Sequence, residues 1–221
     1  MELQGKKIAF LGDSITEGFG VSDRANCRYD NRLKAMCGLA ATYNYGISGT
    51  RLAHKSKPSE KPRHDLCFCG RAYWLAPDAD VIVVFGGTND YGHGDAPLGK
   101  KGDKTPATFY GAVDFLISFL KETYPAAQLV FMTPARRKND EKVSWEQPAD
   151  SSAAHPLLAY VNIMKTVCEA HGVPCLDLYH KLGIDPNVES EREAYAPDGL
   201  HFNDAGHAFI AERLKDFLEA L

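Results

Sequence analysis

Short apolar runs alternate with amphipathic helical patterns along this chain of 221 residues, and this alternation limits how it can fold. Each run is rich in β-branched or aromatic residues and is followed by a turn or a polar segment, which is typical of buried parallel strands. Strand followed by helix, repeated, predicts a parallel sheet with helices on both faces. The predicted strands are Lys7–Leu11, Thr42–Tyr45, Asp80–Phe85, Gln128–Thr133 and Val173–Leu178, of which Thr42–Tyr45 has the weakest pattern. The predicted helices are Arg24–Cys37, Pro106–Tyr124, Pro156–His171 and Asn203–Leu221.

The composition excludes several classes of protein. A hydrophobic content of 44% in a chain of this length is enough for one buried core, so we expect a single α/β domain over residues 1–221. The net charge of −4 predicts no nucleic-acid partner, because the few basic clusters, such as Arg136-Arg137-Lys138, sit beside acidic residues and form no phosphate-binding patch. No apolar stretch approaches the ~20 residues of a membrane span, and the first residues do not have the pattern of a signal peptide. We therefore expect a cytoplasmic protein with no membrane partner.

In a parallel sheet of this kind the functional site lies at the carboxyl ends of the strands. Ser14 directly follows the first predicted strand, in Gly12-Asp13-Ser14, where its hydroxyl is exposed and its backbone N–H has no helical partner. A serine in this place is also a common helix cap. Asp198 and His201 lie just before the last predicted helix; a histidine can deprotonate a serine, and a carboxylate can orient the imidazole. Taken alone, this pair could equally belong to an ordinary loop.

Two further motifs follow predicted strands. Asn89 lies in a Gly-Gly-Thr-Asn-Asp sequence and can donate an amide N–H to an anionic oxygen, as a tetrahedral intermediate requires. Gly49 follows the weak strand and can present its backbone N–H to the same oxygen. Gly, Asn and Asp are also the usual residues of turns, so each motif gains meaning only from the others.

Together, and in this order, the four motifs resemble those of the SGNH hydrolase superfamily, also called the GDSL esterases and lipases. The resemblance implies a flavodoxin-like three-layer α/β/α sandwich around a mainly five-stranded parallel sheet. It also implies a triad in which Ser14 is the nucleophile, His201 the base and Asp198 the acid. Ser14 and Gly49 would supply backbone N–H groups to an oxyanion hole, and Asn89 its side-chain amide. The implied mechanism requires no metal or cofactor.

The resemblance extends from Gly12 to His207, with one departure and one open assignment. Phe202 occupies the place after the histidine where many members have proline, and we expect this change to alter packing more than chemistry. Gly46 is the alternative to Gly49 as an oxyanion donor.

Several other residues are candidates for supporting or binding roles. Asp13 and Asp90 flank the proposed catalytic positions and are interpreted as hydrogen-bonding supports. Candidates for contact with the substrate are Asp13, Tyr91 and His93, with Trp74 and Trp145 as weaker candidates for the pocket wall.

Two long segments, 54–70 and 136–154, match no regular element and could border the site or be surface insertions. The first contains Cys67 and Cys69 near His64 and Asp65. Their C-x-C spacing, with no second ligand pair, argues against a zinc site and favours reduced thiols.

Other folds and functions fit less well. An α/β-hydrolase would need a G-x-S-x-G elbow and a dinucleotide-binding fold would need G-x-G-x-x-G after the first strand, and the chain has neither. A flavodoxin-like binding module explains the fold but not the four motifs. Within the esterases, the soluble composition favours an acetylesterase acting on a small polar or carbohydrate ester over a lysophospholipase or lipase.

Overall fold

The structure is a computed structural model that describes residues 1–144 and 155–221. Five parallel strands form one sheet in the order β2-β1-β3-β4-β5. This order, with β1 between β2 and β3, is that of flavodoxin-like sheets. The predicted three-layer α/β/α fold with a five-stranded parallel sheet is therefore confirmed. The strands are β1 (Lys7–Gly12), β2 (Ala41–Gly46), β3 (Val81–Phe85), β4 (Gln128–Met132) and β5 (Cys175–Leu176).

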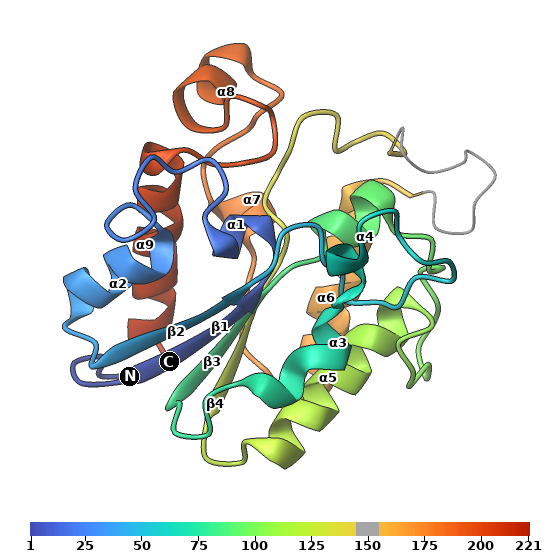
Figure 1. Cartoon of the computed structure of the whole chain (residues 1–221), viewed down its shortest axis with the longest axis horizontal. Coiled ribbons are helices and arrows are strands. Elements are labelled where there is room, and N and C mark those ends of the chain that lie inside the picture. Colours follow the sequence, from blue (N-terminus) through green and yellow to red (C-terminus); the bar gives the residue numbers. More distant parts are fainter. Residues whose placement is uncertain (145–154) are drawn as a thin grey trace.

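Helices cover both faces of the sheet (Figure 1). The helices α2 (Tyr29–Cys37) and α9 (Asp204–Glu219) pack against each other on one face. On the other face lie α3 (Phe68–Arg71), α5 (Phe109–Thr123) and α6 (Leu157–Ala170).

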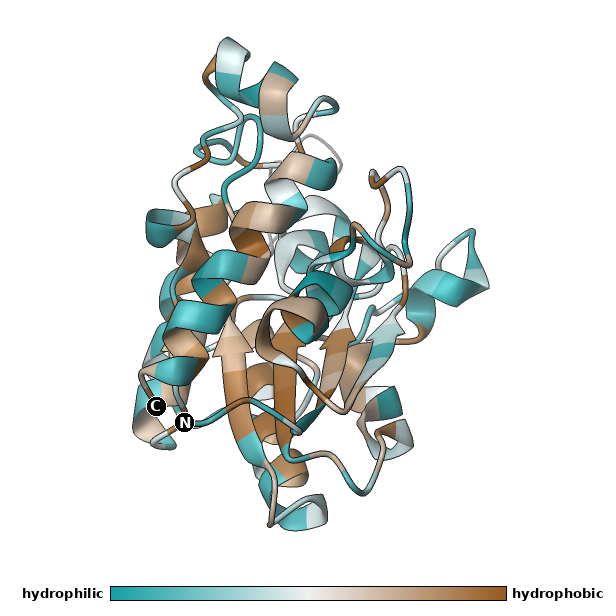
Figure 2. Ribbon diagram, turned by 90° about the vertical axis from the view of Figure 1, so that its left-hand side faces the viewer, coloured by the Kyte–Doolittle hydropathy of each residue, from teal (hydrophilic) through white to brown (hydrophobic). Residues whose placement is uncertain are grey.

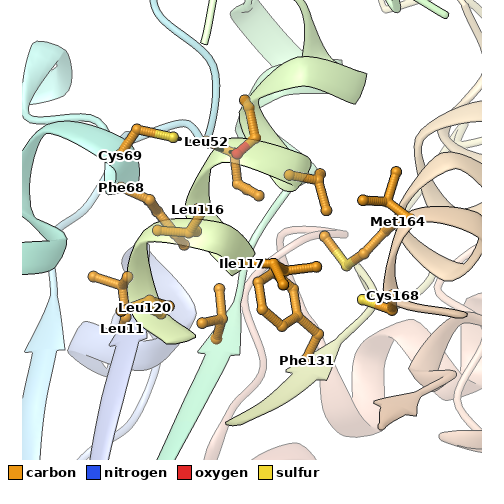
Figure 3. Packing of buried hydrophobic residues seen from close by; sticks show 14 of the residues in the cluster. Leu11, Leu52, Phe68, Cys69, Leu116, Ile117, Leu120, Phe131, Met164 and Cys168 are labelled. Carbon is orange, nitrogen blue, oxygen red and sulfur yellow. Dashed lines mark hydrogen bonds between the residues drawn. The ribbon is translucent and has the colours of Figure 1, made fainter. Parts of the chain in front are cut away.

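The side chains of each strand contribute to two hydrophobic cores, one on each face of the sheet, because successive side chains of a strand point to opposite faces. In β1, Ile8 and Phe10 enter the core beneath α2 and α9, whereas Ala9 and Leu11 enter the core beneath α5 and α6. Figure 2 shows the strands as the most hydrophobic part of the ribbon, with hydrophilic residues on the helices outside them. Figure 3 shows the second core, in which side chains from the sheet meet those of α3, α5 and α6.

The boundaries differ from the sequence prediction where polar side chains end or begin an element. The last strand stops at Leu176 because the Asp177 carboxylate caps α7 (Leu178–Lys181) by accepting the His180 N–H. The first long helix begins at Tyr29 instead of Arg24.

Short helices were missed by the sequence analysis, because one or two turns are too short to show a helical period. They are α1 (Ser14–Glu17), η1 (Pro62–Asp65), η2 (Ala72–Trp74), α4 (Thr88–His93) and α8 (Glu189–Tyr195), together with α3 and α7. Within the two described ranges, every helix is too short or too polar to cross a membrane.

Candidate active site

Three of the predicted site residues form a hydrogen-bonded row at the carboxyl edge of the sheet. Ser14 opens α1 directly after β1, and its Oγ lies 2.9 Å from Nε2 of His201. The other ring nitrogen, Nδ1, lies 2.6 Å from Oδ2 of Asp198. Tertiary folding thus joins residues from the two ends of the chain in the order hydroxyl, imidazole, carboxylate, which suits removal of the serine proton by the ring.

The Asp198 carboxylate is held by its own turn. Its Oδ1 accepts the backbone N–H groups of Leu200 at 2.9 Å and His201 at 2.7 Å. Partial burial raises the pKa of Asp198, but the hydrogen bonds from the His201 ring and the two N–H groups outweigh it and hold the pKa at about 2. The carboxylate is therefore ionised at neutral pH and can stabilise a protonated imidazole.

A second ring lies against His201. The centroids of the Phe19 and His201 rings are 4.4 Å apart. Phe202 is directed into the core on the α2 and α9 side and is almost fully buried, so the residue that replaces proline acts here as packing.

Gly49 has the geometry expected of a backbone donor. Its φ of +76° lies in the left-handed region that favours glycine. Among the described residues, no acceptor pairs with the backbone N–H of Gly49 or with that of Ser14. The alternative, Gly46, already donates its N–H to Oδ1 of Asn44 at 2.9 Å. Gly46 instead lets β2 approach α1, because a Cβ there would lie 2.1 Å from the Glu17 nitrogen.

The Asn89 side chain comes from α4, which follows β3. Its Nδ2 donates one hydrogen bond to the Thr50 carbonyl at 3.0 Å. An amide nitrogen carries two protons, so a second N–H is available for a ligand oxygen. The bond to Thr50 links Asn89 to the loop that carries Gly49, and the three candidate donors therefore belong to one connected framework.

The buried carboxylate of Asp90 holds the same loop through hydrogen bonds to its backbone. The carboxylate accepts the backbone N–H groups of Leu52 at 3.0 Å and Ala53 at 2.9 Å. Burial raises the pKa of Asp90 to about 6, against the lowering effect of those two hydrogen bonds. The expectation that Asp90 is a hydrogen-bonding support agrees with these contacts.

Arg71 is a buried organiser that the sequence analysis missed. Its guanidinium donates to the carbonyls of Gly12 at 2.7 Å, Leu66 at 2.9 Å and Tyr45, and to the hydroxyl of Thr50 at 3.1 Å. Burial lowers the pKa of Arg71 to about 10, which leaves it charged at neutral pH. It ties the carboxyl ends of β1 and β2 to the loop after β2. The only sequence signal was a lone cation inside the otherwise apolar run 66–75.

Glu17, also missed, joins three segments. One of its oxygens accepts from the N–H and the hydroxyl of Ser48, both at 2.6 Å, and the other pairs with Arg63 at 2.7 Å. The helix that begins with Ser14 is thereby fastened to the Gly49 loop and to segment 54–70.

The candidates for substrate contact have different environments. Asp13 is 1% exposed and accepts the Ile15 N–H at 3.0 Å, and burial raises its pKa to about 6. The Tyr91 ring is also buried, and its hydroxyl donates to a backbone carbonyl of segment 136–144. Any effect of these two residues on a substrate therefore passes through the groups they hold. His93 is half-buried, with its ring beside Arg51.

The two tryptophans do not help to define the site. Trp74 lies in η2, before the amino end of β3, and is exposed, so the suggestion that it lines the pocket is wrong and it is a surface aromatic. Trp145 lies outside the described residues.

Both long segments border the site where they are described. The His64 ring of segment 54–70 occupies the space beside Gly49, 2.4 Å from where a Cβ of that residue would lie. From the other segment, the Lys138 N–H donates to the Gly199 carbonyl at 2.7 Å, next to the turn of Asp198 and His201.

The cysteines of segment 54–70 belong to the core. Cys67 and Cys69 are buried, and the Cys69 thiol donates to the Ala112 carbonyl. Over residues 1–144 and 155–221, no three His, Cys, Asp or Glu side chains form a group that could hold a metal ion.

Comparison with known proteins defines the class. The family model of the GDSL-like Lipase/Acylhydrolase family matches residues 10–209. The chain belongs to this family, which is a family of carboxylic ester hydrolases. The resemblance to the SGNH hydrolases is thereby confirmed.

The individual relatives share between a fifth and a third of their residues with this chain. An acetylxylan esterase of Xylanibacter ruminicola is 23% identical over 227 residues, which cover 93% of this chain and 42% of that protein. The chain thus spans less than half the length of this curated relative. A solved structure of a Lactobacillus plantarum protein is 32% identical, with a TM-score of 0.82 over 99% of this chain and 98% of that one. A variant of an acetyl-xylooligosaccharide esterase from Geobacillus is 20% identical, with a TM-score of 0.63 over 99% and 96% of the two chains.

Proposed function

We propose that this chain is a serine esterase that hydrolyses a small carboxylic ester through an acyl-enzyme, acting as one domain over residues 1–221. The observation that carries the proposal is the row formed by Ser14, His201 and Asp198, with 2.9 Å and 2.6 Å between successive polar atoms. A binding module of the same fold would have no use for such a row.

The reaction proceeds in two acyl-transfer steps. His201 Nε2 takes the Ser14 hydroxyl proton as Oγ attacks the ester carbonyl, and Asp198 stabilises the imidazolium. The negative charge that develops on the carbonyl oxygen is held by the N–H groups of Ser14 and Gly49 and by the Asn89 amide. The proton on His201 then passes to the leaving alcohol. Water, deprotonated by the same ring, releases the acid and restores the serine.

The substrate we propose is an acetyl ester of a polar alcohol or a carbohydrate. Two of the similar proteins are described as esterases of acetylated xylan or xylo-oligosaccharides. The hollows beside segment 54–65 are lined largely by charged and polar side chains, which suits a polar ester better than the long alkyl chain of a lipid.

The test is the hydrolysis of p-nitrophenyl acetate by the wild type and by Ser14→Ala. We expect the substitution to lower kcat by several orders of magnitude, because no other group replaces the nucleophile. Urea unfolding of both proteins controls for loss of the fold. A Ser14→Ala variant that kept full activity would refute the proposal.

The same assay with p-nitrophenyl esters of increasing chain length tests the acyl group. We expect acetate to be preferred. A preference for long chains would instead identify a lipase or lysophospholipase with the same catalytic residues.

A further inference from the structure

Each of the two oxyanion donors that do not come from Ser14 has a histidine beside it. His64 lies against Gly49, with its nearest ring atom 2.4 Å from where a Cβ of that residue would lie. His93 follows Asn89 by one helical turn on α4, which places both side chains on the same side of that helix. The centroids of the two imidazole rings are 5.7 Å apart. Two histidines from separate segments thus meet next to the proposed oxyanion hole.

The position of His64 is fixed by its neighbours in sequence. Arg63 pairs with Glu17 at 2.7 Å, and Asp65 pairs with Arg51 at 2.9 Å. One ion pair therefore precedes the histidine and the other follows it, and each partner lies close in sequence to Ser14 or Gly49. The ring itself forms no hydrogen bond with a described residue.

The contact with Arg51 decides which nitrogen of His93 carries a proton. The Arg51 guanidinium lies 3.3 Å from Nδ1 of His93, and a guanidinium can only donate. Nδ1 must therefore accept, and the proton of the neutral ring lies on Nε2. Burial first, and the positive charge of Arg51 second, lower the pKa of His93 to about 4, so the ring is neutral at neutral pH. Burial also lowers the pKa of His64.

The two rings line a cavity of about 370 Å³ whose lining residues all have polar or charged side chains. Its charged residues are two lysines and one glutamate. A neutral imidazole offers one donor and one acceptor, which matches the hydroxyl and ether oxygens of a sugar. The residues that line the cavity are Lys55, Ser59, Glu60, Lys61, His64 and His93.

We propose that His64 and His93 form a subsite that binds a hydroxylated leaving alcohol, such as a sugar ring, through hydrogen bonds to its oxygens. This inference rests on the proposed esterase function, and it assigns recognition of the alcohol to residues that take no part in the acyl transfer itself. In it, Nε2–H of His93 donates to a substrate oxygen, and His64 bonds a neighbouring hydroxyl.

The experiment compares two substrates that share the acetyl group. One is an acetylated methyl xyloside and the other is p-nitrophenyl acetate, which has no hydroxylated ring. His93→Phe and His64→Phe keep a ring of similar size but lose its hydrogen bonds. Each should lower kcat/KM for the sugar ester about tenfold more than for p-nitrophenyl acetate, as loss of a hydrogen bond worth about 1.4 kcal/mol would.

Two further variants separate recognition from general damage. His93→Gln keeps a donor near the position of Nε2 and should recover most of the lost preference. His180→Phe makes the same change at an exposed histidine beyond β5 and should leave the ratio between the two substrates unchanged.

Three results would overturn the subsite: an equal fall on both substrates, an unaltered ratio in both His64→Phe and His93→Phe, or a wild type that hydrolyses p-nitrophenyl acetate but no acetylated sugar. Failure of the esterase proposal would look different. In that case the wild type would not hydrolyse p-nitrophenyl acetate, or Ser14→Ala would still do so.

Discussion

The turn that carries Asp198 and His201 and the loop that carries Gly49 both lie next to α1, yet different contacts hold them. The turn is held mainly by local contacts: Asp198 bonds two backbone N–H groups and a ring that are two or three residues away, and the Lys138 N–H adds one long-range bond to the Gly199 carbonyl. The loop is held by side chains distant in sequence, namely Glu17, Arg71, Asn89 and Asp90.

Their electrostatic environments differ in the same way. The Asp198 side chain is half exposed, and its hydrogen bonds hold its pKa at about 2. Asp90, which supports the loop, is buried, and burial raises its pKa to about 6. The carboxylate that orients the catalytic imidazole is therefore half exposed and ionised, whereas the part of the site that would bind the oxyanion depends on buried polar groups. We expect substitutions in the turn to affect mainly catalysis, and substitutions beneath the loop to affect mainly stability.

The largest effect is expected for Asp198→Asn. An amide in this place would donate to Nδ1 of His201 and leave Nε2 protonated, so the ring could not accept the Ser14 proton. Turnover should fall by on the order of 10³- to 10⁴-fold in a p-nitrophenyl acetate assay. Since the asparagine oxygen can still accept from the turn, the fold should survive. Loss of the ionised carboxylate should nevertheless lower the urea midpoint at neutral pH, because the lowered pKa of Asp198 stabilises the folded state there. A kcat above a tenth of the wild-type value would contradict the role of Asp198.

Arg71→Met should have the next largest effect, this time on stability. It leaves buried carbonyls of Gly12, Tyr45 and Leu66 without their donor, and the free energy of unfolding should fall by about 3–5 kcal/mol. Arg63→Met is the matched control, because that guanidinium is more than half exposed and its ion pair is worth at most ~1 kcal/mol. Similar losses in the two variants, measured by urea unfolding, would mean that the loop is not supported from its buried side.

Asn89→Ala should lower turnover by roughly a hundredfold, since one of three oxyanion donors is removed. It also removes the bond to the Thr50 carbonyl, which should cost about 1 kcal/mol of stability. Both losses are expected of a residue that supports the Gly49 loop and also donates a hydrogen bond to the oxyanion. An unchanged turnover number would contradict the role of Asn89 as an oxyanion donor and leave only its structural role.

The smallest effect is a pH dependence of stability, which should differ between the carboxylates of Asp90 and Asp198. An aspartate in the unfolded chain titrates near pH 4, whereas the pKa of buried Asp90 is about 6. Between these values the folded protein keeps a proton that the unfolded chain has lost, so the contribution of Asp90 to stability falls as pH rises, by about 2–3 kcal/mol.

Asp90→Asn should remove this contribution, so its stability relative to the wild type should rise from pH 4 to pH 6.5 in urea unfolding. Asp198→Asn is the control. The pKa of Asp198 is lowered to about 2, so its stabilising contribution develops between about pH 2 and 4 and is constant above that window. A relative stability of Asp90→Asn that does not change with pH would show that burial does not raise the pKa of Asp90.

Much of the fold, and the candidates for the hydrogen-bonded row of the site, could be predicted from the sequence, because both depend on local sequence patterns. Apolar runs alternating with helical periods predicted the parallel sheet. Ser14, Asn89 and Gly49 were candidates because each follows a predicted strand, and Asp198 and His201 because they lie three positions apart in one turn. Their expected roles came only from the resemblance of the four motifs together to the SGNH hydrolases. The short helices had too few residues to show a period, and the boundary at Asp177 depends on a cap.

Tertiary structure alone decided which side chains support the site. Arg71 and Asp90 act across 21 to 59 residues of sequence, and no spacing rule reveals such contacts. The meeting of His64 with His93 likewise depends on two ion pairs that fold segment 54–65 against Gly49. A local pattern determines which groups can react, whereas burial and long-range hydrogen bonds determine how they are held, because those depend on the complete packed fold.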